Sequence, residues 1–438
     1  MEEQRKTDLA FFNRYYESSN SGILVVYGHR NVEFDSIIFK FIENRRSFYY
    51  SARSVSEKEQ IFLWSRELER EGGRLEDKAS YRDVLSLALN SSGRNPVIFV
   101  IRNFEYIIKT SDSFMRDLTE TVKKTKDFRQ ILVLLVSNDV SWVENSMVSG
   151  LGEYSPEVSG IRKIKPLSFA EMRSHFGNMS YVDVVLSYSV LGGQTLLWRY
   201  FDDKLTFKEN IIKNILDPGT FLSGEAIRLT DKCLRETAVY HTLLSEMARG
   251  VSKLNDLYHY TGFSRAKISV YLKTLIHHDF VYKAYSFGNA GRENVMKGVY
   301  KIADPFLDFY FRFIFPNESC LMQFPAEQFY NEFIAPGICS YANEYFKLVC
   351  REYIFGLWEK GFLGFDIEEE GEWIGKEGNI DIIVQGEMGD TAFGICALER
   401  RLTHADLEKL LYCAKKARLE CDAIYLFSTQ GFDEWLCD

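Results

Sequence analysis

Five apolar, strand-like segments alternate with helical patterns over the first 165 residues, and this alternation constrains the fold more than any other feature. The segments are Ile23–Tyr27, Ser47–Tyr50, Pro96–Ile101, Ile131–Val136 and Arg162–Ile164, with helical patterns at Ser56–Glu71 and Ser113–Lys124. Near-continuous apolar strands separated by helices are typical of a parallel sheet that is covered on both faces. The sequence therefore predicts an α/β domain over residues 1–165.

The turn after the first strand has the position of a phosphate-binding loop but lacks its chemistry. A working loop reads G-x-x-x-x-G-K-[ST]: backbone N–H groups hold the phosphates, Lys reaches the terminal phosphates and Ser or Thr binds Mg²⁺. Here the eight positions hold Gly28, His29, Arg30, Asn31, Val32, Glu33, Phe34 and Asp35. Two carboxylates and a phenyl ring stand where phosphate would bind, so these residues are predicted to be a vestigial nucleotide-binding position.

The third strand ends in a second altered motif. In an active ATPase this strand ends in an Asp that binds Mg²⁺, followed by a Glu that positions water. This chain has Arg102 and Asn103 there, and Glu105 lies two residues further on. An arginine cannot ligate Mg²⁺ and an asparagine cannot act as a base. Ser137-Asn138 follows the next strand, at the position of a polar phosphate sensor, although this dipeptide is also common in turns.

Residues 166–302 read first as helices and then as a different pattern. Residues 166–235 are helical throughout, whereas residues 236–302 form three helices followed by two strands around a glycine-rich turn. That order is typical of a winged helix-turn-helix, and the segment holds nine Lys or Arg against five Asp or Glu. Its third helix presents Arg265, Lys267 and Lys273, which are candidate DNA contacts. The alternative is that the segment only packs between domains.

Short motifs follow one another in a fixed order along nearly the whole chain. They are Phe12-Asn13-Arg14, Tyr27-Gly28-His29-Arg30, Lys165-Pro166-Leu167-Ser168-Phe169, Leu191-Gly192-Gly193, Tyr300–Phe306 and Phe311–Asn317. In this order they resemble the archaeal-type ATPases of the AAA superfamily, a clade close to the STAND ATPases, which use ATP and Mg²⁺. The resemblance implies an AAA-type, P-loop-like parallel-sheet domain at 1–165, a helical lid at 166–235, a winged helix at 236–303 and a restriction-nuclease-like α/β domain at 304–438.

The carboxyl-terminal part retains one residue of the metal site that such a nuclease would need. The nuclease pattern is I-D followed by E-C-K on the next strand, with a helical Glu upstream. Asp381 keeps the acid, but Ile395 and Ala397 replace the Glu and Lys of the second strand, and Lys347 replaces the helical Glu. One acid cannot hold and activate a divalent metal in the usual way. Asp381 is therefore a vestigial metal residue. The acidic stretch Asp366–Glu372 is expected to be a solvated loop.

Composition limits the class of protein. A chain of 438 residues can hold two to four domains, and 46% hydrophobic with 26% charged residues is ordinary for a globular protein. The net charge of −9 disfavours indiscriminate binding to nucleic acid. No apolar run is long enough to cross a bilayer and the amino terminus lacks a signal-peptide pattern, so we expect a cytoplasmic protein with no membrane contact. The eight cysteines form no C-x-x-C pair and are expected to be free thiols.

Three functions are compatible with these patterns. In the first, the chain is a non-catalytic member of an ATP-binding family, with no catalytic residue and no cofactor, and acts as a binding or regulatory scaffold for a protein partner. In the second, it is a divergent protein that still binds nucleotide. In the third, it is a DNA-binding regulator that works through the winged helix. The first is favoured, because a carboxylate that faces triphosphate is a costly like-charge contact.

Overall fold

The structure is a computed structural model that describes residues 3–29, 32, 35–69, 79–288, 298–375 and 377–436. The chain divides into two compact units. The first contains residues 1–166 with 194–196, and the second contains residues 167–193 with 197–438. The finer division of the second unit at residues 235 and 303 remains a prediction.

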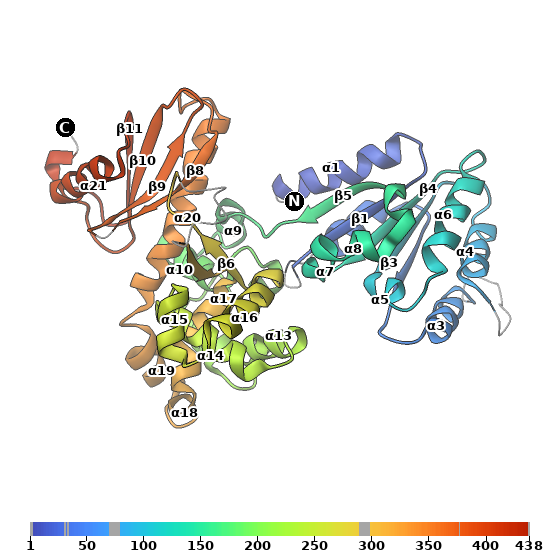
Figure 1. Cartoon of the computed structure of the whole chain (residues 1–438), viewed down its shortest axis with the longest axis horizontal. Helices are drawn as coiled ribbons and strands as arrows, with labels where there is room; N and C mark the ends of the chain where they lie inside the picture. The colour runs from blue at the N-terminus through green and yellow to red at the C-terminus, as the bar shows by residue number, and fades with distance from the viewer. Residues whose placement is uncertain are drawn as a thin grey trace. The chain divides into compact units, whose positions relative to one another are not determined.

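The first unit is an α/β domain built on a five-stranded parallel sheet (Figure 1). Its strands are β1 (Gly22–Gly28), β2 (Ser47–Ser51), β3 (Val97–Arg102), β4 (Ile131–Ser137) and β5 (Val158–Ile164). Its helices are α1 (Glu3–Glu17), α2 (Asp35–Ile42), α3 (Glu57–Glu69), α4 (Tyr81–Asn90), α5 (Glu105–Ile108), α6 (Phe114–Thr125), α7 (Val140–Asn145) and α8 (Met147–Leu151). The strands lie in the order β2-β3-β4-β1-β5, and each adjacent pair is parallel.

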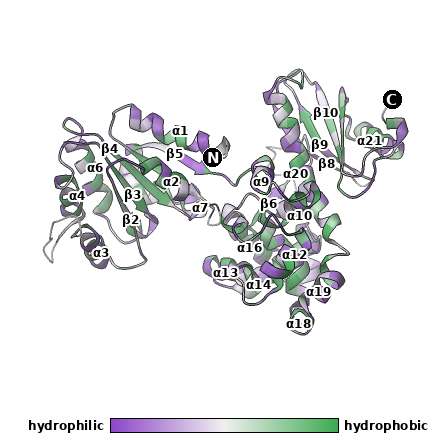
Figure 2. Ribbon diagram, turned by 180° about the vertical axis from the view of Figure 1, so that it is seen from behind, coloured by the Kyte–Doolittle hydropathy of each residue, from purple (hydrophilic) through white to green (hydrophobic). Residues whose placement is uncertain are grey.

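Both faces of this sheet are buried, as the apolar strand runs predict. Along β1, Ile23 and Val25 face a core shared with α3, α4 and α6, whereas Leu24 and Val26 face a second core shared with α1 and α2. Figure 2 shows the strands mostly in the colour of hydrophobic residues, whereas α1 and α4 carry hydrophilic stretches. β1, β3 and β4 run in the same direction. Their carboxyl ends therefore lie along one edge of the sheet.

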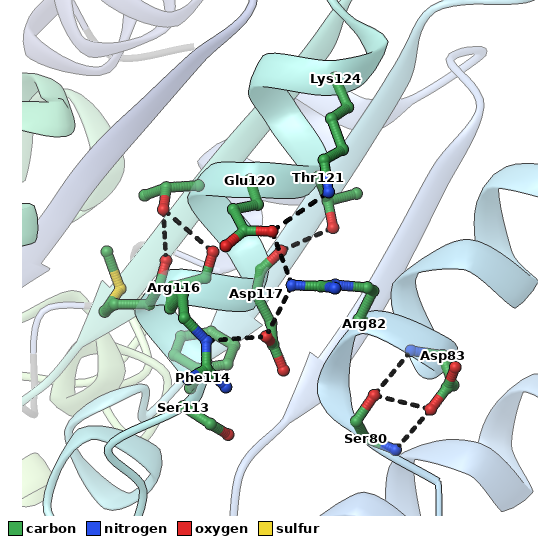
Figure 3. Close-up of polar contacts among 12 residues, drawn as sticks. Ser80, Arg82, Asp83, Ser113, Phe114, Arg116, Asp117, Glu120, Thr121 and Lys124 are labelled. Carbon is green, nitrogen blue, oxygen red and sulfur yellow. Dashed lines mark hydrogen bonds and ion pairs between the residues drawn. The ribbon is translucent and has the colours of Figure 1, made fainter.

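A charged network fastens α4 to α6 on one face of the first unit. Arg82 of α4 lies between two acids of α6, with Nη2 3.4 Å from Asp117 Oδ1 and 2.6 Å from Glu120 Oε2 (Figure 3). The Asp117 side chain is only 5% exposed, and Arg116 Nε lies 3.4 Å from the same oxygen. A buried carboxylate needs such partners, so this cluster has a structural role.

The second unit begins with helices and ends with a sheet. Its α-helices before the sheet are α9 (Phe169–His175), α10 (Tyr181–Leu191), α11 (Thr195–Trp198, which begins in the first unit), α12 (Phe207–Ile211), α13 (Glu225–Cys233), α14 (Thr237–Ala248), α15 (Leu254–Thr261), α16 (Arg265–His277), α17 (Pro305–Phe309), α18 (Glu318–Leu321), α19 (Ala326–Phe329) and α20 (Ile338–Glu359). An antiparallel hairpin of β6 (Val281–Ala284) and β7 (Val299–Ile302) follows α16. The three helices and hairpin predicted at 236–302 are thus present in that order.

The carboxyl-terminal sheet has four strands in the order β11-β10-β9-β8. They are β8 (Glu369–Ile374), β9 (Asn379–Gln385), β10 (Thr391–Ala397) and β11 (Ala423–Ser428), and α21 (His404–Ala417) connects the last two. The expectation of a solvated loop at Asp366–Glu372 is wrong from Glu369 onward, because that stretch pairs with β9 as an edge strand. An edge strand needs to bury little of its side chains, so an acidic composition is compatible with it.

Within the described ranges, no helix combines the length and the apolar character that a membrane crossing requires.

Candidate functional site

The predicted nucleotide position lies where β1 ends and α2 begins. Gly28 is the last residue of β1 and is buried, and His29 follows it. The N–H of Val32 donates to His29 O at 3.0 Å, and the Val32 side chain is only 1% exposed. Arg30, Asn31, Glu33 and Phe34, which the sequence also assigns to this position, lie outside the described residues. The site is therefore built from the residues that flank them.

Asp35 and Arg102 form an ion pair at the edge of the sheet where the strands end. Asp35 is the first residue of α2, Arg102 is the last residue of β3, and Arg102 Nη1 donates to Asp35 Oδ2. The two side chains are 24% and 22% exposed. The hydroxyl of Tyr49 lies 3.5 Å from the other Asp35 oxygen. Burial lowers the pKa of Arg102 and the charge of Glu105 opposes this change, but a guanidinium keeps its proton in a protein.

The sequence motifs assign these two residues to the positions that hold Mg²⁺ in a working ATPase, namely the Ser or Thr of the loop and the Asp that ends the third strand. Mg²⁺ requires oxygen ligands in octahedral geometry. Arg102 supplies none and instead brings a permanent positive charge against the one carboxylate. The residues present therefore do not fit Mg²⁺. Asp35 adds a negative charge where the loop motif has Ser or Thr, and Arg102 puts a positive charge where the strand motif has Asp. The two changes are complementary, and this complementarity is the sequence signal from which the contact could have been predicted.

Asn103 and Glu105 do not form the catalytic arrangement that follows an ATPase strand. Asn103 has φ +53° and its amide lies 3.4 Å from both Ser51 Oγ and Ala52 O, so it joins the ends of β2 and β3. Glu105 is 4% exposed, and its Oε2 accepts no hydrogen bond from any part of the chain that the structure describes. Burial raises the pKa of Glu105, against hydrogen bonds to its own backbone and to Ser137. This carboxyl is buried and lacks access to a water nucleophile.

The candidate DNA residues lie together on α16, but two of them are engaged within the protein. All three of Arg265, Lys267 and Lys273 are exposed. Arg265 stacks over Tyr258 at 4.1 Å and its Nε donates to Asn255 Oδ1 at 2.9 Å. Lys267 Nζ lies 4.9 Å from the centre of the Phe263 ring. Lys273 is exposed on the same helix, about one and two-thirds turns beyond Lys267.

The hairpin after α16 packs against the carboxyl-terminal sheet. The N–H of Phe287 donates to Glu372 O at 2.8 Å, and the N–H of Ile374 donates to Ser286 Oγ at 3.1 Å. Lys301 Nζ lies 2.5 Å from Glu372 Oε1. These contacts join β7 and the segment that follows β6 to the edge strand β8.

Asp381, the remaining acid of the predicted nuclease site, lies on β9 beside α20. Lys347 Nζ is 3.1 Å from its Oδ1, and the N–H of Cys396 donates to its Oδ2 at 3.1 Å. The carboxylate is therefore bonded within the protein on both oxygens. The sequence identified Lys347 as a charge reversal but not as the partner of Asp381.

The strand order and the all-parallel pairing of the first unit define its class: it is an α/β domain on a five-stranded parallel sheet, and the second unit adds a helical region and a four-stranded sheet. Residues 310–409 match the family model DUF234, described as "Archaea bacterial proteins of unknown function". The chain is 25% identical over 415 residues to the uncharacterized protein MJECL04 of Methanocaldococcus jannaschii. The aligned residues cover 93% of this chain and 89% of that relative.

Two solved structures illustrate the likeness of the fold. The Walker-type ATPase PABY2304 of Pyrococcus abyssi is 15% identical, with a TM-score of 0.48, over 69% of this chain and 94% of that one. The ORC2 protein of Aeropyrum pernix is 10% identical, with a TM-score of 0.43, over 73% of this chain and 93% of that one. The carboxyl-terminal family match and the α/β fold agree with the resemblance predicted from the sequence.

Proposed function

We propose that this chain is a non-catalytic member of an ATPase-like family that acts as a binding or regulatory scaffold for a protein partner. The observation that carries the proposal is the ion pair between Asp35 and Arg102. It engages Asp35, which the loop motif would assign to Mg²⁺ binding, with a guanidinium that cannot ligate a metal. Nucleotide hydrolysis by this fold depends on that metal and on a positioned water.

The rest of the first unit supports a structural use of the fold. The strands of the sheet are buried on both faces with apolar side chains in register. The residue after the third strand serves as a connector, since Asn103 bonds to the end of β2. The domain thus keeps its packed core, while Asp35 and Arg102 at the predicted nucleotide position bond to each other. Such a domain is suited to binding a partner at its surface rather than to catalysis.

The test is a titration of the full-length protein with ATP, in Mg²⁺ and in chelator, followed by calorimetry. We expect no binding tighter than about 1 mM with Mg²⁺, because the loop lacks the lysine that reaches phosphate and Asp35 is paired with Arg102 instead of with a metal. Two variants accompany the wild type: Arg102→Gln, and Lys40→Gln as a matched control on the exposed side of α2, where Lys40 pairs with Glu43.

Micromolar binding that requires Mg²⁺ would contradict the proposal. Metal-independent binding that is lost in Arg102→Gln and kept in Lys40→Gln would instead favour the divergent nucleotide binder, with Arg102 as the phosphate contact.

The exposed basic side chains of α16 favour a second candidate, a DNA-binding regulator. Lys273 is free to reach a phosphate, whereas Arg265 and Lys267 would have to leave their ring contacts. The attachment of the hairpin to β8 weighs against this candidate, because a winged helix that reads DNA also uses its wing.

If this second candidate is correct, the wild type binds duplex DNA with an affinity that falls as salt rises, and the triple change Arg265→Ala, Lys267→Ala and Lys273→Ala removes most of the binding. The matched control removes the same charge from the same unit, at the exposed Lys213, Lys232 and Lys360. Fluorescence anisotropy at several salt concentrations measures both. Equal loss in the two triple variants would exclude α16 as a specific contact.

A further inference from the structure

The carboxyl-terminal domain has its own partly buried cation, the ammonium group of Lys347. This side chain projects from α20 and is 14% exposed. Its Nζ lies 2.7 Å from Glu344 Oε1 on the same helix and 3.1 Å from Asp381 Oδ1 on β9. Burial alone would lower the pKa of Lys347, but the charges of Asp381 and Glu344 outweigh it and raise the pKa above its ordinary value. The lysine is therefore charged.

The surroundings of Lys347 form a built site rather than a chance surface pair. Asp381 is 19% exposed and its second oxygen accepts the N–H of Cys396 on β10. One helical turn before Lys347, Asn343 Oδ1 accepts the N–H of Leu398 at 2.9 Å. One stretch of α20 thus bonds to β9 and to the residue that follows β10.

A divalent metal does not fit this arrangement. Mg²⁺ and Mn²⁺ need several oxygen ligands, and the described part of the chain brings together no group of three or more His, Cys, Asp or Glu side chains that could hold a metal ion. A nuclease-like site would have a helical Glu as a ligand at position 347, whereas this chain has the positively charged Lys347 there.

We infer that the Lys347 ammonium takes the place of the divalent cation between α20 and β9, and that it holds the helix on the sheet without metal. The inference concerns the second unit and extends the proposed function, since Arg102 stands at the metal position of the first unit in the same way. In both units a protein cation bonds to a carboxylate at a position that the sequence motifs assign to a metal site. On this inference, the packing of α20 on the carboxyl-terminal sheet does not depend on a divalent metal.

This inference predicts a latent metal site. Changing Lys347→Glu would remove the resident cation and place a new carboxylate beside Asp381 and Glu344. The three acids would repel one another until a divalent cation bound among them. The wild type, in contrast, would gain nothing from the metal.

The experiment is scanning calorimetry of full-length protein in Mn²⁺ and in EDTA. We expect the Tm of the wild type to be the same in both. Lys347→Glu should melt lower in EDTA and rise by about 3–5 °C in Mn²⁺. Lys360→Glu, at the exposed end of α20, is the matched control and should not respond to Mn²⁺.

Two further variants keep the test decisive if Lys347→Glu fails to fold. Lys347→Met keeps the length of the side chain and should lower the Tm, and adding Asp381→Asn to it should lower the Tm no further than the worse single change. A Mn²⁺ response in the wild type that Asp381→Asn abolishes would overturn the inference. So would a folded Lys347→Glu that ignores Mn²⁺, or a Lys347→Met with unchanged Tm. We expect none of these variants to change the result of the ATP titration. Failure of this inference can therefore be distinguished from failure of the proposed function.

Discussion

Replacing Gly193 with alanine is expected to destabilise the second unit by about 3–5 kcal/mol. The N–H of Leu167 donates to Gly193 O at 2.9 Å, and this close approach leaves no room for a side chain. A Cβ at residue 193 would lie 2.0 Å from Leu167 O and 2.4 Å from Leu167 N. Both atoms belong to the backbone, so the overlap can be relieved only by separating two segments of chain. Calorimetric unfolding of the full-length protein measures the loss.

The control for this prediction is Gly177→Ala. A Cβ at residue 177 would meet no atom within 4 Å, and the φ of Gly177 is not positive. We expect its effect to stay within about 0.5 kcal/mol. Similar stabilities for the two variants would show that the contact between Gly193 and Leu167 is looser than the structure describes.

Replacing Phe287 with alanine is expected to cost about 3–5 kcal/mol, the usual range for a buried phenylalanine. Phe287 lies just after β6, is 7% exposed and packs in one core with Ile380, Ile383 and Phe393 of the carboxyl-terminal sheet. Its N–H also donates to Glu372 O. The residue therefore joins the hairpin to the sheet, and its truncation should both lower stability and release the hairpin.

Denaturant unfolding measures the first effect, and limited proteolysis at the hairpin measures the second. Tyr260→Ala serves as the control, because that ring is 70% exposed on α15 and its removal should change neither result. If Phe287→Ala were as stable and as protease-resistant as the wild type, the hairpin would not depend on this packing. If the variant gained DNA affinity, the attachment to β8 would be restraining the winged-helix candidate.

The sequence was informative wherever burial is two-sided. The strand runs at Ile23–Tyr27 and Ile131–Val136 predict β1 and β4 because a parallel sheet buries every residue of its inner strands. β8 was missed because an edge strand with half-exposed side chains carries no such pattern: its Glu369-Glu370 start is compatible with solvent on one side. Local composition cannot tell this strand from a loop.

The candidate sites show the same contrast between what the sequence predicts and what depends on the tertiary structure. The identity of a side chain fixes whether it can ligate a metal, and this much is readable from the sequence. The sequence lacks the loop lysine, the acid at residue 102 and the ligands at residues 395 and 397. These losses argue against the usual metal chemistry at both predicted sites. Only the tertiary structure decided what replaced that chemistry. Asp35 and Arg102 are 67 residues apart in the chain, and Lys347 and Asp381 lie on different elements. Which charges meet depends on strand order and on how a helix packs against a sheet, and neither is encoded in the spacing of the residues.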